Sequence, residues 1–346
     1  MATKKSRASK DRTVRQVETP QVQTRKCGVD FDSDDTINRA SDGKMPWFGW
    51  LGLAIMILSE ILLWTGNHPI AVAFTPVMWT GYILLVDGWI WARGGRSYFR
   101  DDKFEWPMLA LFSILIWVMF EMFNLSAWAW AYEHRPANRL IEALVFAWAF
   151  ATIIPALLRT RSLFATFHFF DRTHPWKNFK FTPFWQAVSF IVGLGLTFIP
   201  VMFEGCNYQN MNNCTPNILV WMVWLGFIFM IEPINYRLGA PSVFCHLEEG
   251  KTSFLWQVLA AGLFCGLLWE TWNIQATRFN GLTWNYHLNR IYLIPSFNEQ
   301  GGFWHIGKMP ILGFIGYPPF IWECFALWEL VKWAMHGDRM FKAPAR

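Results

Sequence analysis

The chain has 346 residues and a net charge of +5, with 18% of its residues aromatic and only 16% charged. Soluble globular domains carry about 25% charged residues, so this deficit argues against a soluble protein. The 23 Trp residues support the same conclusion, because Trp is enriched where a membrane meets water. The composition therefore predicts an integral membrane protein.

The first 45 residues are polar and have no apolar core, so we expect no secretory signal peptide. Basic residues crowd the first part of this segment: Lys4, Lys5, Arg7, Lys10, Arg12, Arg15, Arg25 and Lys26. We interpret residues 1–45 as a cytoplasmic tail. The alternative is an arm that docks on anionic lipid or on a partner in a larger membrane complex. Nucleic acid is not expected as a partner, because no aromatic side chain interrupts the basic run.

Eight apolar runs follow the tail, each close to the roughly 20 residues that a helix needs to cross about 30 Å of hydrocarbon. They cover residues 47–65, 70–92, 106–130, 140–158, 183–203, 217–236, 253–273 and 311–333. Lipid offers the backbone no hydrogen-bond partners, so continuous runs of this length predict helices. The expected fold is all-α and polytopic, with about eight transmembrane helices.

Lys and Arg are distributed unevenly over the short loops between these runs. They gather in loops 93–105, 159–182 and 237–252, whereas loops 66–69 and 204–216 have none. The positive-inside rule then places the N- and C-termini in the cytoplasm.

Two cysteines lie in a loop on the predicted outer side, where conditions are oxidising. Cys206 and Cys214 are eight positions apart. Because disulfides persist in oxidising compartments, we predict that these two residues are bonded. The alternative is two free thiols that share a loop.

The sequence repeats itself at an offset of 145 residues. The second run and its following loop match the sixth without a gap: Gly81-Tyr82, Asp87, Gly94, Ser97 and Phe99 against Gly226-Phe227, Glu232, Gly239, Ser242 and Phe244. Both copies run in the same direction, so we predict two tandem, parallel four-helix repeats. Their expected bounds are 46–160 and 183–334, with a basic linker at 161–182 and a cytoplasmic tail at 335–346.

Acidic side chains inside the predicted helices are the main candidates for function, because a charge in a bilayer costs about 2.5–3.5 kcal/mol. The candidate site residues are Glu121, Asn124, Glu270, Asn273 and Glu323. The first two and the next two form i,i+3 pairs, each on one helix face, and the pairs correspond across the repeat. We expect them to converge near the internal axis, as a general acid, a proton relay or a cation ligand. The alternative is a brace that hydrogen-bonds neighbouring helices or loop amides.

Other polar and aromatic features carry narrower expectations. We expect Asp87 and Glu232 to pair with Arg93 and Arg237 near helix ends. Residues in and beside loop 274–310 are expected to form an aromatic cap at the outer interface: Trp272, Trp284, Tyr286, Tyr292 and Trp304.

Two consecutive prolines, Pro318 and Pro319, interrupt the last apolar run. They remove two backbone donors, so they predict either a helix broken beside a polar cavity or a helix that begins only after Pro319.

Several cofactors are not expected. The histidines fall in predicted loops or at helix ends, which argues against haem and against chlorophyll held by a midspan His. No midspan Lys is available for a retinal Schiff base. The common metal-binding and nucleotide-binding motifs are missing, so we predict no metal site.

Three segments resemble a known family: Thr75-Pro76 with Gly81-Tyr82 and Asp87; Glu232-Pro233-Ile234-Asn235-Tyr236-Arg237 through Ser242 to Trp269-Glu270-Thr271-Trp272-Asn273; and Met309-Pro310 to Glu323. Over roughly residues 70–330 the chain resembles a family of uncharacterised multi-spanning bacterial membrane proteins. The resemblance implies a bacterial inner (cytoplasmic) membrane and a shared fold, and it implies no activity.

Three functions remain open from the sequence. The first is an enzyme or binding protein for a lipidic or isoprenoid-like molecule, with the five candidate residues as its polar centre and Trp and Phe around the apolar body. The second is a proton-coupled secondary transporter that uses the same carboxylates. The third is a non-catalytic accessory subunit of a larger membrane complex, docked through its N-terminal tail.

Overall fold

The computed structural model describes residues 43–171, 179–207, 209, 214–287 and 305–337, and helices account for 75% of it. Within these residues, seven helices are long and apolar enough to cross a membrane, which confirms the predicted all-α, multi-pass class. They are α2 (Trp47–Trp64), α3 (His68–Ala92), α5 (Glu105–Ala127), α6 (Arg139–Ala165), α7 (Pro183–Phe198) with the 3-10 helix η1 (Ile199–Met202), α11 (Ser253–Arg278), and α12 (Tyr317–His336) preceded by the 3-10 helix η4 (Ile311–Gly316).

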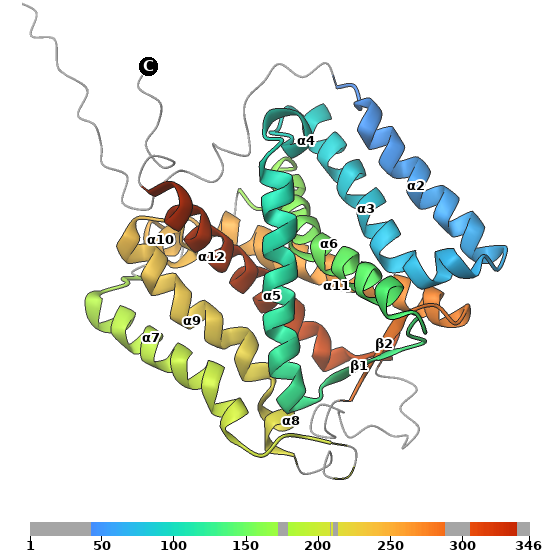
Figure 1. Ribbon diagram of the computed structural model, residues 1–346. Coiled ribbons are helices and arrows are strands. Elements are labelled where there is room, and N and C mark those ends of the chain that lie inside the picture. Colours follow the sequence, from blue (N-terminus) through green and yellow to red (C-terminus); the bar gives the residue numbers. More distant parts are fainter. Residues whose placement is uncertain (1–42, 172–178, 208, 210–213, 288–304, 338–346) are drawn as a thin grey trace, which may run out of the picture.

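The remaining described elements are α9, which is as long as α2, and several short segments. They are α4 (Tyr98–Asp101), α8 (Thr215–Leu219), α9 (Trp221–Leu238), α10 (Val243–Glu248), β1 (Trp130–Glu133), β2 (Thr283–Tyr286), β3 (His305–Ile306) and β4 (Met309–Pro310). In Figure 1, α4 and α10 lie toward one end of the bundle, and the β1–β2 ladder and α8 lie toward the other.

The run predicted at 217–236 divides into α8 and α9. α9 packs against α7 and α12. Glu232, Asn235 and Arg237 lie in its second half, and it is not among the seven helices that meet the length and composition expected of a span. Composition therefore supports seven spans, one fewer than the sequence predicts.

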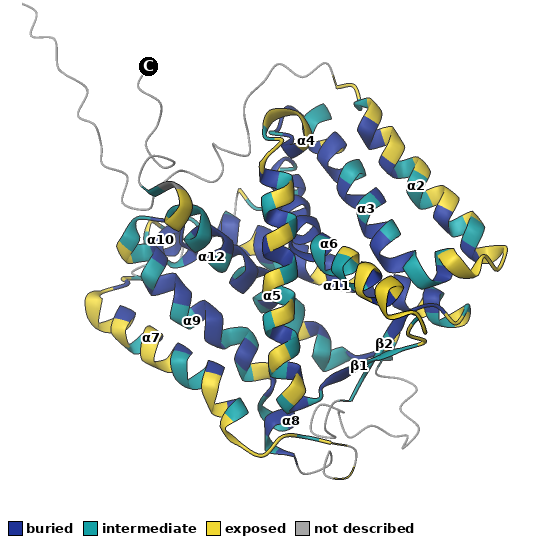
Figure 2. Ribbon diagram, viewed as in Figure 1, coloured by how far each residue is buried: buried dark blue, intermediate teal, exposed yellow. Residues whose placement is uncertain are grey.

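The outward faces of α2, α5 and α7 are apolar. Figure 2 shows exposed residues along all three helices. Among them, Trp50 is 59% exposed, Leu125 82% and Ile191 67%. A soluble fold would bury large apolar side chains of this kind, so the pattern supports a lipid environment. The spans of α3 and α11 are the most deeply buried of the seven.

Small residues allow two helix pairs to pack closely. A Cβ added at Gly52 of α2 would lie 2.4 Å from the carbonyl oxygen of Gly81 in α3. A Cβ added at Gly226 of α9 would meet Thr197 of α7 in the same way. Such close approach is common where membrane helices pack without a hydrophobic driving force.

The end of the run predicted at 106–130 is not helical. α5 stops at Ala127, and Trp128 adopts a left-handed conformation, with φ of 46°, that turns the chain into β1. β1 pairs with β2 in an antiparallel ladder in which Trp130 faces Tyr286. The aromatic residues at 128–130 are compatible with a helix or with a strand. Pairing of β1 with the distant strand β2 favours the strand.

A buried corner at the α4 end holds Asp87. Its carboxylate accepts hydrogen bonds from Ser97 Oγ at 2.6 Å and from the amide of Tyr98 at 3.1 Å. It also forms an ion pair of 3.0 Å with Arg159 of α6, and both side chains are fully buried. The predicted pair with Arg93 is therefore wrong, because a more distant Arg reaches the same corner.

The α10 end has a matching corner around Glu232. Ser242 Oγ donates to this carboxylate at 2.5 Å, and the amide of Val243 donates at 3.2 Å. Trp322 Nε1 of α12 also donates to the Glu232 carboxylate, at 2.6 Å. The predicted pair with Arg237 is also wrong, since Arg237 donates to a glutamine of α7.

The two prolines of the last run lie in the first turn of α12. The helix begins at Tyr317, so the missing N–H groups of Pro318 and Pro319 fall where a helix has no intrahelical partners for them. Of the two interpretations, the structure favours a helix that starts at the prolines over one that breaks in midspan.

Cys206 and Cys214 are joined by a disulfide, with their Cα atoms 5.5 Å apart. The amide of Cys206 donates to the carbonyl of Ser126 at 2.8 Å. This contact holds the loop after η1 against the end of α5.

Candidate functional site

A pocket lies between α3, α5, α6, α9, α11, the β1–β2 ladder and the start of α12. About 1010 Å³ of it, including its mouth, is unoccupied by protein atoms. Twelve of the 22 residues that line it in the described chain are aromatic, and none is Lys, Arg, His, Asp or Glu. Six are tryptophans: Trp79, Trp117, Trp130, Trp224, Trp269 and Trp284. The pocket can hold an apolar group, with indole, phenol and hydroxyl groups as its polar contacts.

Glu121 lies directly behind one wall of the pocket. Its Oε1 accepts hydrogen bonds from Trp117 Nε1 at 2.9 Å, Trp130 Nε1 at 3.0 Å and the Tyr132 hydroxyl at 2.6 Å. All three donors line the pocket. The carboxylate therefore orients the polar atoms of this wall.

Glu270 takes the corresponding place behind another part of the wall. Its Oε1 accepts from the hydroxyls of Tyr286 at 2.7 Å and Tyr317 at 3.3 Å. The side chain is fully buried, and Oε2 has no hydrogen-bond partner among the described residues. This oxygen faces the turn of the β3–β4 hairpin, because a Cβ added at Gly307 would lie 3.1 Å from it.

Asn124 holds the start of β1. Its Oδ1 accepts from the amides of Ala129 at 2.8 Å and Trp130 at 3.2 Å, and its Nδ2 donates to the carbonyl of Trp130 at 2.9 Å. The amide side chain thus satisfies backbone groups where α5 gives way to the strand. These contacts support the bracing role for this residue.

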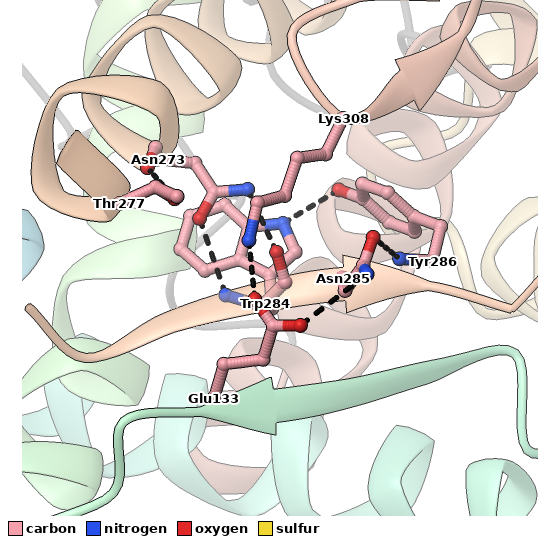
Figure 3. A network of polar contacts seen from close by, with 7 residues as sticks. All are labelled: Glu133, Asn273, Thr277, Trp284, Asn285, Tyr286 and Lys308. Carbon is pink, nitrogen blue, oxygen red and sulfur yellow. Dashed lines mark hydrogen bonds and ion pairs between the residues drawn. The ribbon is translucent and has the colours of Figure 1, made fainter. Parts of the chain in front are cut away.

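Asn273 holds β2 in the same manner. Its Oδ1 accepts from the amide of Trp284 at 3.1 Å, and its Nδ2 donates to the carbonyl of Trp284 at 3.0 Å. Figure 3 shows this bracket together with Trp284 Nε1, which donates to the Tyr286 hydroxyl at 2.7 Å. Each Asn therefore holds the backbone of a Trp that lines the pocket, Trp130 or Trp284.

Glu323 stands apart from the other candidates. It is fully buried in α12, and neither carboxylate oxygen has a hydrogen-bond partner in the parts of the chain that the structure describes. It follows Phe320, which lines the pocket, by one helical turn. Glu121 and Glu270 are linked to the pocket through their donors, and no such link is seen for Glu323.

The sequence predicted Trp and Phe around an apolar ligand without naming which residues, and it did not predict the tyrosines. Trp284 and Tyr286 were expected in an interfacial cap, but they line the internal pocket. Trp272 is buried within α11, and Tyr292 and Trp304 lie outside the described residues. The recurrence of Trp130-Ala131-Tyr132 as Trp284-Asn285-Tyr286 was the available signal for their placement.

Tyr132 and Tyr286 act as hydrogen-bond donors. Burial raises the pKa of both phenols well above its usual value, and the neighbouring carboxylates raise it further. Both side chains therefore keep their proton at neutral pH.

An ion pair holds the β3–β4 hairpin over β1. Lys308, in the turn of the hairpin, donates to Glu133 at 2.5 Å, and Asn285 Nδ2 donates to the same carboxylate at 3.3 Å. Figure 3 shows Lys308 reaching toward Glu133 across β2. The hydrogen bond from Lys308 is the main reason that the pKa of Glu133 lies below its usual value.

No metal site is seen in the described part of the chain, where no three His, Cys, Asp or Glu side chains are placed to share an ion.

Two further acids in the long helices have their own partners. Glu60 accepts hydrogen bonds from Gln275 at 3.1 and 3.2 Å, and Glu142 pairs with Arg135 and Arg139.

No protein-family model, curated protein or solved structure matches the chain. The resemblance noted above therefore rests on its residues alone. The pocket and its surroundings provide the basis for a functional proposal.

Proposed function

We propose that this chain is an eight-span membrane protein made of two parallel four-helix repeats, and that it binds or transforms a lipid-soluble molecule in the aromatic pocket. The matching corners around Asp87 and Glu232 support the repeats, because each acid contacts a Ser and an amide at positions 145 residues apart. α9 would then be the eighth span, in the place that α3 has in the first repeat.

The β1–β2 ladder supports the same arrangement. Trp130 faces Tyr286, and Tyr132 faces Trp284, so the ladder looks alike from either strand. A twofold axis between the repeats would pass between Ala131 and Asn285 at its centre.

The pocket would lie on this axis. Trp79 and Trp224, which are 145 residues apart, both line it, and so do Trp130 and Trp284. Binding sites at the interface of two repeats are common in membrane proteins with internal symmetry.

The lining carries the proposal for the ligand. Twelve aromatic residues surround the space, and its polar atoms belong to indole, phenol and hydroxyl groups. Aromatic walls favour a rigid or unsaturated apolar molecule over a sugar or a small ion. A lipidic or isoprenoid-like compound fits this chemistry, with Glu121 and Glu270 available to orient or activate it through their donors.

A cytoplasmic N-terminus would put the pocket in the outer half of a bacterial inner membrane. This orientation is supported by the basic loops and by the position of the Cys206–Cys214 bridge on the opposite side from α4 and α10.

A pocket-filling variant tests the proposal. Gly316 lines the pocket, and a Cβ there would meet only Trp224, at 3.9 Å. Gly316→Leu should therefore fill the cavity without disturbing the helices. Gly195→Leu in α7 is the matched control, because its Cβ would meet only Ile199, at 3.5 Å, and the residue does not line the pocket.

The measurement is mass spectrometry of lipid-soluble compounds that copurify with the wild-type protein and each variant. We expect one compound class to be retained by the wild type and by Gly195→Leu and to be lost from Gly316→Leu. Equal retention by all three proteins would contradict ligand binding in this pocket.

A proton-coupled transporter is the second candidate. The buried, unpartnered carboxylate of Glu323 is the observation that favours it, since such groups often carry protons across membranes. Glu323→Gln should then abolish proton-coupled uptake in vesicles, whereas an enzyme that uses Glu121 and Glu270 would keep its activity.

A further inference from the structure

Three observations together indicate the charge of the ligand. The first is the aromatic lining. Twelve of the 22 lining residues are aromatic, and six of these are tryptophans. The face of an aromatic ring carries partial negative charge, so rings gathered around one space can attract a cation.

The second observation is an uncompensated negative charge behind the walls. The donors to Glu121 are two indoles and a phenol, and the donors to Glu270 are two phenols. No Lys, Arg or His among the described residues forms an ion pair with either carboxylate, and none lines the pocket.

Some acids elsewhere in the molecule differ in this respect, since Asp87 pairs with Arg159 and Glu133 pairs with Lys308. Glu232 and Glu323 also have no ion pair among the described residues, but neither is linked to the pocket through a donor that lines it. Glu121 and Glu270 are thus the acids without a cationic partner that adjoin a space which a cation can enter. A carboxylate at membrane depth requires a counter-charge or a proton, and a bound cation can provide the counter-charge.

The third observation concerns the kind of cation. A primary ammonium brings three N–H donors and needs acceptors. The walls offer few acceptors for these donors: the indole N–H groups only donate, the Tyr132 and Tyr286 oxygens already accept from Trp117 and Trp284, and the Thr75 hydroxyl is one acceptor without a partner among the described residues. A quaternary ammonium has no N–H and needs only ring faces and nearby negative charge, so it suits these walls better.

We propose that the pocket selects lipophilic cations, and quaternary ammonium compounds in particular, over neutral molecules of the same shape. This inference rests on the proposed function, because it names the substrate class of the same pocket. Glu121 and Glu270 supply the charge selectivity, and the aromatic walls supply the affinity for the apolar body.

Two probes of equal shape isolate the charge: phenyltrimethylammonium, and tert-butylbenzene, in which carbon replaces nitrogen. Binding of each to the purified full chain in uncharged maltoside micelles is measured by equilibrium dialysis against protein-free micelles. We expect the cation to bind about tenfold more tightly than its neutral counterpart.

Variants assign the preference to the two acids. Glu121→Gln, Glu270→Gln and the double variant should lower the affinity for the cation and leave that for tert-butylbenzene unchanged. Glu60→Gln is the matched control, because Glu60 lies outside the pocket, and its cation preference should equal that of the wild type. If the double variant does not fold, the single variants and Trp224→Leu, which removes one ring face, should each lower the preference.

The outcomes separate the two proposals. Equal binding of the two probes to the wild type overturns the cation inference, and so does a preference that survives every Glu→Gln variant. If Gly316→Leu weakens the binding of both probes, the pocket remains a ligand site in either case. If Gly316→Leu changes neither, the proposed function itself is overturned.

Discussion

Tyr132 donates a hydrogen bond of 2.6 Å to Glu121, and so ties β1 to the last third of α5. Tyr286 makes the matching bond to Glu270, and each hydroxyl also accepts from an indole, Tyr132 from Trp117 at 3.2 Å and Tyr286 from Trp284 at 2.7 Å. Trp117 donates to Glu121 as well, whereas the Trp284 indole donates to Tyr286, so the loss of the Tyr286 hydroxyl leaves its indole with less.

This difference predicts unequal effects of removing the hydroxyl. Tyr132→Phe leaves Glu121 with two indole donors, whereas Tyr286→Phe deprives both Glu270 and Trp284 of a partner. We expect a loss of stability of about 1–3 kcal/mol for Tyr286→Phe and a smaller loss for Tyr132→Phe. The measurement is chemical denaturation in detergent followed by Trp fluorescence. If the two variants lost equal stability, or Tyr132→Phe lost more, the Glu270 carboxylate would have partners beyond those described.

Substitution of Asn273 separates its two possible roles. Asn273→Ala removes both hydrogen bonds to the backbone of β2, so a brace should lose roughly 1–3 kcal/mol of stability together with ligand binding. Asn124→Ala at β1 should behave alike. If either variant were as stable as the wild type but did not bind the ligand, the amide would act on the ligand and not on the strand.

The two buried corners should respond differently to loss of their charge. Asp87→Asn removes a charge that pairs with Arg159 in a fully buried place, which should cost roughly 3–5 kcal/mol. Glu232→Gln removes a charge whose hydrogen-bond donors are neutral, so its effect should be smaller. The midpoints of thermal denaturation in detergent provide the comparison, and a larger shift for Glu232→Gln would contradict it.

The Glu133–Lys308 pair should make stability depend on pH only under acid conditions. The pKa of Glu133 is lower in the folded protein than in the unfolded chain, so its contribution is complete above the unfolded value of about 4.3. That contribution is lost as the pH falls through the lower folded value. Because the carboxylate is partly exposed, the effect should be under about 1 kcal/mol. The difference in denaturation midpoint between the wild type and Glu133→Gln should shrink from pH 7 to pH 3, and a constant difference would contradict the pairing.

Reporter fusions test the orientation. A green fluorescent protein fused after Arg346 should fluoresce in bacterial cells, because it would remain in the cytoplasm. Alkaline phosphatase inserted after Gln209 should be active, because it would lie on the oxidising side. The opposite pair of results would invert the topology.

The helices could be predicted from the sequence because a long apolar run in lipid has few alternatives. The i,i+3 spacing of Glu121 and Asn124 also predicted correctly that the two share a helix face. Their different roles were not visible, because they depend on where the chain turns after Trp128.

Contacts between distant segments were the main source of error. Arg93 is six residues from Asp87, but Arg159 reaches it from another helix. The pocket could not be predicted from the sequence for the same reason, since its walls come from segments that meet only in the folded chain. Sequence periodicity shows which face of a helix is polar, but not which partner that face meets.

The ladder matches at its flanks but not at its middle, where Ala131 faces Asn285. Asn285 donates to Glu133 beneath the hairpin, while a methyl group stands opposite. Neither side chain lines the pocket, whose walls carry the matching Trp130, Tyr132, Trp284 and Tyr286. The departure from symmetry therefore lies outside the pocket, and an occupant would meet the same pair of side-chain types from each strand.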